Sequence, residues 1–119
     1  TNCRNEMAMR KISKIRVRKY AEQGGLCFYC RQPMWEAEPN RFAQSKNLPK
    51  GRLRWLRSTA EHLVAQCDGG GDQASNVVAA CAFCNSRRHR SRKPLAPEAY
   101  AEHVRRRLGQ GRWHGITLR

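Results

Sequence analysis

The sequence predicts one small domain of the α+β class, held together by cross-linked side chains rather than by a large apolar core. Two Cys-x-x-Cys pairs, at positions 27 and 30 and at positions 81 and 84, supply side chains for such a link. Residues 57–90 change from an extended pattern to a helical one, and apolar positions recur at helical spacing over residues 97–108. At 119 residues, the chain is long enough for one domain with a modest core.

Composition divides the chain into three parts. Residues 1–22 form a basic N-terminal arm, and we expect a helix over residues 11–22. Residues 23–92 form the central unit, which carries an insertion at residues 35–57. Residues 93–119 form a C-terminal helix and tail.

The first half of the central unit is expected to turn tightly. Gly24 and Gly25 stop the first helix, because glycine takes the left-handed cap conformation at little steric cost. A tight turn follows at residues 27–30, and Pro33 ends it. The insertion at residues 35–57 has no clear period and indicates a loop or a short helix. Its basic residues could line a groove for phosphates, or they could belong to a solvated surface loop.

The second half predicts strand, loop, strand and helix in that order. Residues 57–64 favour extended structure and lead into three glycines at 69–71, which mark a loop. Because no Lys-Ser or Lys-Thr follows these glycines, the loop is not a P-loop. We expect a second strand at residues 77–80 and a basic helix from residue 82 to about residue 90, ended by Pro94.

A last helix is predicted from the proline and acid at its start. Pro97 suits the first helical position, Glu98 suits the positive end of the helix dipole, and Gly109 marks the end. Trp113, Ile116 and Leu118 in the tail are expected to fold back onto the core.

The charge of the chain indicates a polyanionic partner. Lys and Arg number 24 against 9 Asp and Glu, which gives a net charge of +15. Nucleic acid is favoured over an acidic membrane surface, because no basic amphipathic helix with a broad apolar face accompanies the charge. A merely soluble basic protein is the plainer alternative. The sequence shows neither a membrane span nor the apolar core of a signal peptide, so we expect an intracellular (cytoplasmic) protein without membrane contact.

The two cysteine pairs favour a structural zinc site. Zinc prefers four ligands in a tetrahedron, and each Cys-x-x-Cys turn can bring two thiolates to one ion. Such a site would tie the early turn to the late helix and stabilise a small core. A redox Cys-x-x-Cys and two disulfides are the alternatives. Cys3 and Cys67 are expected to be free thiols. The four predicted zinc ligands are Cys27, Cys30, Cys81 and Cys84.

A second group of residues suits phosphodiester hydrolysis, which needs a base for water and a cation for developing charge. His62 is a candidate base near neutral pH, and Glu61 beside it offers a hard oxygen to a divalent ion. Asn85 offers a neutral oxygen from the start of the late helix. His89 follows four residues later on the same helical face, as a ligand, a phosphate contact or a helix-end cation.

Residues 25–89 resemble the HNH endonucleases, whose zinc-bound members have a ββα-metal (His-Me finger) fold. The resemblance rests on both cysteine pairs, Glu61-His62, the glycine turn, Asn76-Val77-Val78 and Asn85 after the last cysteine. It implies that His62 is the general base, that Asn76 braces the loop to orient His62, and that Glu61 and Asn85 hold the catalytic ion. Glu61 stands where the family more often has aspartate, and Asn85 where it often has histidine, which favours Mg²⁺ or Mn²⁺ over a softer metal.

The predicted activity is therefore that of a metal-dependent DNA endonuclease or nickase. A non-catalytic zinc-stabilised nucleic-acid-binding module is the rival, and a thiol redox protein is a weaker third interpretation. One active site cuts one strand, so a monomer, the expected state, would nick, whereas a symmetric dimer could break both strands. The residues predicted to contact DNA phosphates are Arg57, Arg87, Arg88 and Arg90.

Overall fold

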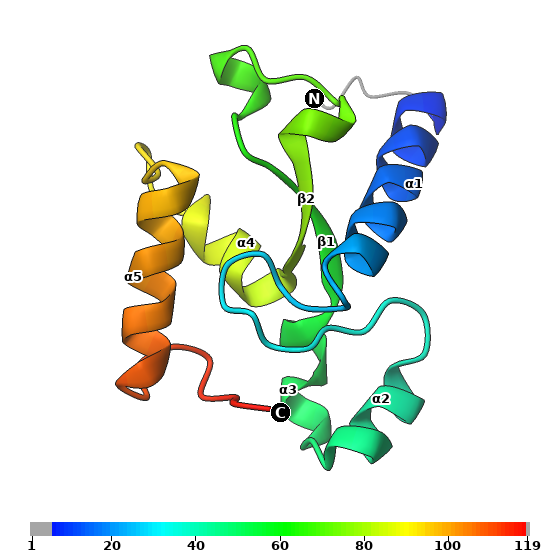
Figure 1. The fold of residues 1–119 in the computed structure, drawn as a ribbon, viewed down its shortest axis with the longest axis vertical. Coiled ribbons are helices and arrows are strands. Elements are labelled where there is room, and N and C mark those ends of the chain that lie inside the picture. The colour runs from blue at the N-terminus through cyan, green and yellow to red at the C-terminus, as the bar shows by residue number, and fades with distance from the viewer. Residues whose placement is uncertain (1–5, 119) are drawn as a thin grey trace.

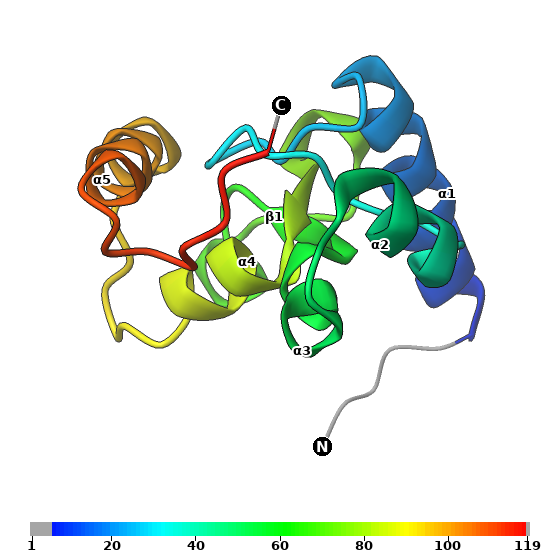
Figure 2. The same ribbon diagram turned by 90° about the horizontal axis from the view of Figure 1, so that it is seen from below.

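The computed structural model describes residues 6–118, and these form a small α+β fold around a two-stranded antiparallel sheet. Helix α1 lies on one side of the sheet, α4 and α5 lie on the other, and α2 and α3 lie beyond one end of the strands (Figures 1 and 2). Cys3 lies outside the described residues. No helix within residues 6–118 is long and apolar enough to cross a membrane.

Helix α1 spans Glu6–Glu22 and therefore begins earlier than the predicted residue 11. Its first turns contain Met, Ala, Arg and Lys, which are strong helix formers, so the helix extends without a clear amphipathic pattern. Ile15 is buried against the sheet. Gln23, just after the helix, bonds both backbone groups of Ala79, with Nε2 2.8 Å from the carbonyl oxygen and Oε1 3.0 Å from the amide nitrogen. This side chain fixes α1 to strand β2.

The glycine stop and the tight turn are confirmed. Gly24 and Gly25 have φ angles of +67° and +76°, in the left-handed region. The turn closes where the Cys27 amide donates to the Gln32 carbonyl at 2.9 Å. An isolated bridge between Leu26 and Pro33 ends it, as predicted.

The insertion is mostly helical rather than a loop. It contains α2 (Pro39–Lys46), α3 (Lys50–Leu53) and the short 3-10 helix η1 (Arg54–Leu56). Trp35 joins its two ends, because its indole Nε1 donates to the Leu53 carbonyl at 2.8 Å and its amide donates to the Leu56 carbonyl at 3.1 Å. The insertion is therefore docked on the domain.

Strand β1 (Ser58–His62), strand β2 (Val77–Cys81) and helix α4 (Ala82–Arg88) follow the predicted order. The strands pair with Glu61 opposite Val78 and His62 opposite Val77. The side chain of Cys81 caps α4, its Sγ accepting from the Cys84 amide at 3.4 Å. The helix ends at Arg88, two residues before the expected end and well before Pro94.

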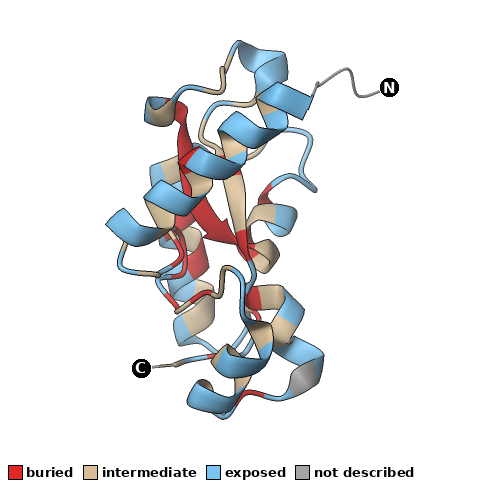
Figure 3. Cartoon of the chain, turned by 90° about the vertical axis from the view of Figure 1, so that its right-hand side faces the viewer, coloured by how far each residue is buried: buried red, intermediate tan, exposed pale blue. Residues whose placement is uncertain are grey.

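Helix α5 spans Pro97–Gly109, with the start and end that the sequence predicts. Beyond it, Ile116 is buried and Trp113 and Leu118 pack against the core, which confirms that the tail folds back. Burial is greatest along β2, whose five residues are all buried, and around the cysteines (Figure 3). The core thus lies where the cysteine pairs meet the sheet.

Candidate metal centre and active site

The four predicted zinc ligands come together in one buried cluster. Cys27 and Cys30 come from the tight turn, and Cys81 and Cys84 come from the end of β2 and the first turn of α4. Their Sγ atoms all lie within 4.8 Å of one another. A tetrahedral zinc ion with bonds of about 2.3 Å separates its sulfur ligands by about 3.8 Å, and Cys30 Sγ lies 3.9 Å from Cys81 Sγ. These side chains could hold a structural metal ion such as zinc.

The protonation of these thiols is strongly coupled. Burial raises the pKa of the Cys84 thiol well above its ordinary value, and hydrogen bonds with Cys27 and Cys30 raise the pKa of Cys81. Hydrogen bonds from Cys27 and Cys81 lower the pKa of Cys30. Burial and these mutual bonds therefore oppose ionisation of Cys81 and Cys84, and a divalent cation among the four sulfurs would favour their thiolate forms.

The C-terminal tail supplies side-chain donors to the sulfurs. Trp113 Nε1 donates to Cys84 Sγ at 3.3 Å, and His114 Nε2 lies 3.5 Å from Cys30 Sγ. His114 Nδ1 accepts from the Ile116 amide at 3.1 Å, so the ring proton is on Nε2 and that nitrogen donates. The sequence predicts only a packing role for Trp113 and no role for His114.

Glu61 is the centre of a second polar cluster. Its side chain is 1% exposed. Oε2 accepts from the Tyr29 hydroxyl at 2.7 Å and from Arg88 at 2.8 Å, and Oε1 lies 2.8 Å from His89 Nε2. Burial, with the nearby Glu61 charge, raises the pKa of Tyr29 above its ordinary value, so the phenol stays a donor. His89 is 37% exposed and connects this cluster to solvent.

Arg88 does not lie where a phosphate contact would need it. Its side chain is 6% exposed. Besides Glu61, its guanidinium bonds the backbone carbonyls of His62, Leu63 and Leu95 at 3.0 to 3.3 Å. Arg88 is a buried structural partner of Glu61, unlike the exposed Arg57, Arg87 and Arg90.

Asn85 lies across from Glu61's strand. Its Nδ2 donates to Thr59 Oγ1 at 3.0 Å and to the Ala60 carbonyl at 3.1 Å. Thr59 and Glu61 are two residues apart on β1 and so face the same side, toward α4. Strand β1 holds the side-chain nitrogen of Asn85. Its side-chain oxygen, Oδ1, has no hydrogen-bond donor within residues 6–118.

His62 points to the loop between the strands, not to the Glu61 cluster. Its Nε2 lies 2.8 Å from Asp72 Oδ1. Asn76 bonds two positions of this loop: Oδ1 accepts from the Val64 amide at 2.9 Å, and Nδ2 donates to the carbonyls of Val64 and Gly71 at 3.0 and 2.9 Å. The sequence did not predict a role for Asp72, which is one residue of the glycine-rich loop.

The predicted catalytic residues thus form two adjacent groups. Glu61 and His89 bond each other between β1 and α4, where Asn85 bonds Thr59 and Ala60 of the same strand. His62 pairs with Asp72 at the end of β1. Among the described residues, one cluster has three or more His, Cys, Asp or Glu side chains close enough to hold an ion, and it is the group of four cysteines.

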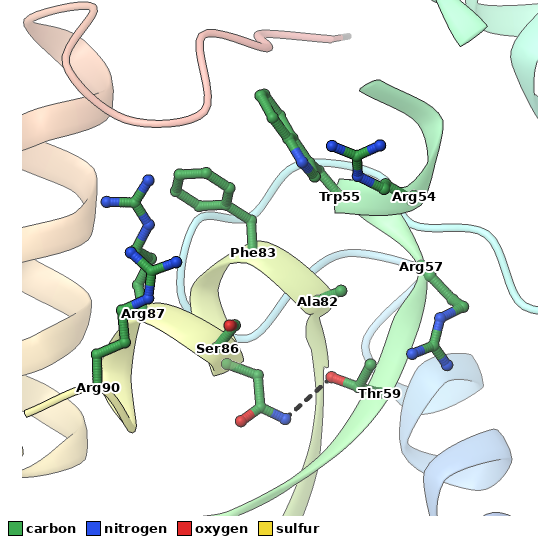
Figure 4. Close-up of a pocket in the computed structure, with 10 residues that line it drawn as sticks. Arg54, Trp55, Arg57, Thr59, Ala82, Phe83, Ser86, Arg87 and Arg90 are labelled. Atoms are coloured by element: carbon green, nitrogen blue, oxygen red, sulfur yellow. Dashed lines mark hydrogen bonds between the residues drawn. The ribbon is translucent and has the colours of Figure 1, made fainter. Parts of the chain in front are cut away.

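A basic pocket of about 640 Å³ opens beside Asn85, between η1, β1 and α4 (Figure 4). Thr59 and Asn85 are among its lining residues. Trp55 and Phe83 form an aromatic wall, and Arg54, Arg57, Arg87 and Arg90 surround it, so three of the four arginines predicted to contact DNA line one pocket. Comparisons of the chain with protein-family models, curated proteins and solved structures found no match.

Proposed function

We propose that this protein is a metal-dependent DNA endonuclease or nickase, with β1, β2 and α4 as a ββα-metal core. The observation that supports it most directly is the approach of Glu61 Oε1 to His89 Nε2 at 2.8 Å, beside Asn85 and the arginine-lined pocket. An acid and an imidazole from two elements, with an amide one helical turn away, make a donor set suited to a divalent ion.

His62 is assigned the role of general base. An ionised carboxylate only accepts hydrogen bonds, so Asp72 fixes the ring proton on Nε2 and leaves the lone pair on Nδ1. The Asn76 bonds hold the loop that carries Asp72, and through it the orientation of the imidazole. Neutral His62 would take a proton from water as that water attacks phosphorus.

Glu61, Asn85 and His89 would hold Mg²⁺ or Mn²⁺, which when bound stabilises negative charge on the phosphate and the leaving oxygen. Arg57, Arg87 and Arg90 would position the neighbouring phosphates. Arg88 has no such role here; its guanidinium bonds Glu61 Oε2 at 2.8 Å and holds that carboxyl group in place. The cysteine cluster would hold zinc and fix α4 against the tight turn.

The test is cleavage of supercoiled plasmid with Mg²⁺ or Mn²⁺. We expect nicked circles from the native protein and a loss of at least about 100-fold in rate for His62→Ala, the usual contribution of a general base. His103→Ala, on α5, is the matched histidine control and should keep the rate. Equal nicking by the two variants, or no nicking with either metal, would contradict the proposal.

A non-catalytic nucleic-acid-binding module is the second candidate, favoured by one observation. Glu61 is almost fully buried and both of its oxygens are already bonded by protein groups. A binding module would bind DNA with an affinity that falls as salt rises. The slope of log K against log salt concentration would be about −0.9 per phosphate contacted. That binding would survive His62→Ala, and no nicking would occur under any metal.

A further inference from the structure

We propose that the pocket beside Asn85 binds an unpaired nucleotide of the DNA strand, with its base stacked on the rings of Trp55 and Phe83. This inference deepens the proposed function and rests on it for the identity of the polymer. It specifies the substrate class as DNA with an unpaired or displaced base near the bond to be cut.

The three tryptophans of the chain differ in how their indole groups are used. Trp35 Nε1 donates to the Leu53 carbonyl at 2.8 Å, and Trp113 Nε1 donates to Cys84 Sγ at 3.3 Å. Trp55 Nε1 has no hydrogen-bond partner within residues 6–118, and its ring lies half-buried on the pocket wall. A tryptophan that serves only the core normally finds a partner for this donor.

The aromatic wall has the features of a base-stacking platform. Trp55 and Phe83 have ring centroids 5.3 Å apart and are tilted by 56°. Guanidinium groups lie over these rings, Arg54 at 6.0 Å from Trp55 and Arg87 at 4.6 Å from Phe83. Two adjacent planar rings flanked by planar cations favour a further planar group such as a nucleobase.

The charge and size of the pocket suit a whole nucleotide. Four arginines line it, and no acid is among its lining residues. Its volume of about 640 Å³ lies within the roughly 300–1,000 Å³ of small-ligand sites. A phosphate can bind the arginines while its base reaches the aromatic wall (Figure 4).

A base in intact duplex cannot reach that wall. Its faces are covered by stacked neighbours, so only an unpaired or flipped base can stack on protein rings. The pocket also includes Thr59 and Asn85, which are bonded to each other at 3.0 Å, and Asn85 belongs to the candidate ion site. The bound nucleotide would therefore lie next to the scissile phosphate.

The test measures stacking without cleavage. Labelled DNA duplexes carry 2-aminopurine either in one unpaired position or in the matching paired position, and no Mg²⁺ or Mn²⁺ is added. We expect the native protein to quench the unpaired probe and to bind its duplex more tightly than the paired one. Trp55→Leu should weaken binding of the unpaired duplex roughly tenfold or more and abolish quenching, with paired-duplex affinity changed less than about twofold.

Trp55→Tyr keeps an aromatic ring and should retain most of the preference, while melting temperature and metal content check that each variant is folded. Equal weakening of both duplexes by Trp55→Leu, or quenching that persists in it, would overturn the inference. Tighter binding of an RNA strand of the same sequence would overturn the assignment to DNA. Because no step requires cleavage, a protein that fails to nick plasmid can still pass or fail this test.

Discussion

Arg88 and Glu61 form an ion pair of 2.8 Å inside the fold, with the two side chains only 6% and 1% exposed. The pair joins α4 to β1 directly behind the candidate ion site. Arg88 should therefore affect the stability of the fold, whereas the exposed arginines beside it should affect DNA binding. An experiment that measures both can separate the two roles.

Arg88→Met should destabilise the fold by about 3–5 kcal/mol, because it leaves the buried Glu61 carboxylate without its charged partner. Arg90→Met changes an exposed arginine in the turn after α4, two residues away, and should change stability by less than about 0.5 kcal/mol and weaken DNA binding instead. Urea unfolding and DNA titration measure the two effects. If both variants lose the same stability, the Arg88 assignment is wrong. Adding Glu61→Gln to Arg88→Met should restore part of the stability.

We expect the fold to depend on a zinc ion bound by the four clustered cysteines. We expect one zinc ion per chain by elemental analysis, and we expect a chelator to unfold the protein, since binding energy at a structural site is folding energy. Cys81→Ser removes a ligand and should lose both zinc and the cooperative melting transition. Cys67→Ser, at an exposed cysteine outside the cluster, is the control and should keep both. A melting temperature unchanged by chelation would contradict a structural role.

The tail should retain the metal. His114→Phe keeps a ring of similar shape but removes the donor to Cys30, so zinc should be lost about tenfold more readily, the usual scale for such outer contacts. Competition with a coloured chelator measures the rate and affinity. His103→Phe changes a histidine of α5 that bonds no sulfur and should leave both unchanged. Equal zinc loss from the two variants would show that the tail only covers the site.

Much of this arrangement can be predicted from local sequence. The glycine stop, the start of the last helix at Pro97 and the metal cluster each depend on a few neighbouring residues or on fixed ligand spacing. The predicted start of α1 was wrong. The helix begins earlier because its first residues have high helix propensity, although their apolar pattern is weak. The insertion was also more ordered than expected, since Trp35 at its start bonds Leu53 and Leu56 near its end.

The site residues that sequence missed are defined by contacts between distant segments. His114 is far along the chain from Cys30, and nothing local to a tail histidine indicates a sulfur partner. Arg88 was instead predicted to contact DNA phosphates, although the sequence carried a signal for burial: it lies four residues after the buried Cys84, so both point to the same side of α4. Asp72 is paired with His62 only because the loop folds back on the strand end.

Gly70 is the position at which that loop tolerates least change. A Cβ there would overlap the Val64 carbonyl oxygen and come within 2.8 Å of Asn76 Nδ2, and the Val64 backbone cannot move away without breaking the Asn76 bonds. Gly70→Ala should therefore cost roughly 1–3 kcal/mol and displace the loop that holds His62. Plasmid nicking should fall with it.

Gly71→Ala is the matched control, because the added Cβ meets only the end of the flexible Gln73 side chain, which can turn aside. Thermal melting and plasmid nicking of the two variants, measured side by side, separate the positions. A loop that only connects the strands would tolerate both changes equally. A loop that positions the base should lose activity at residue 70 and keep it at residue 71, because only the first change disturbs the Asn76 bonds behind Asp72 and His62.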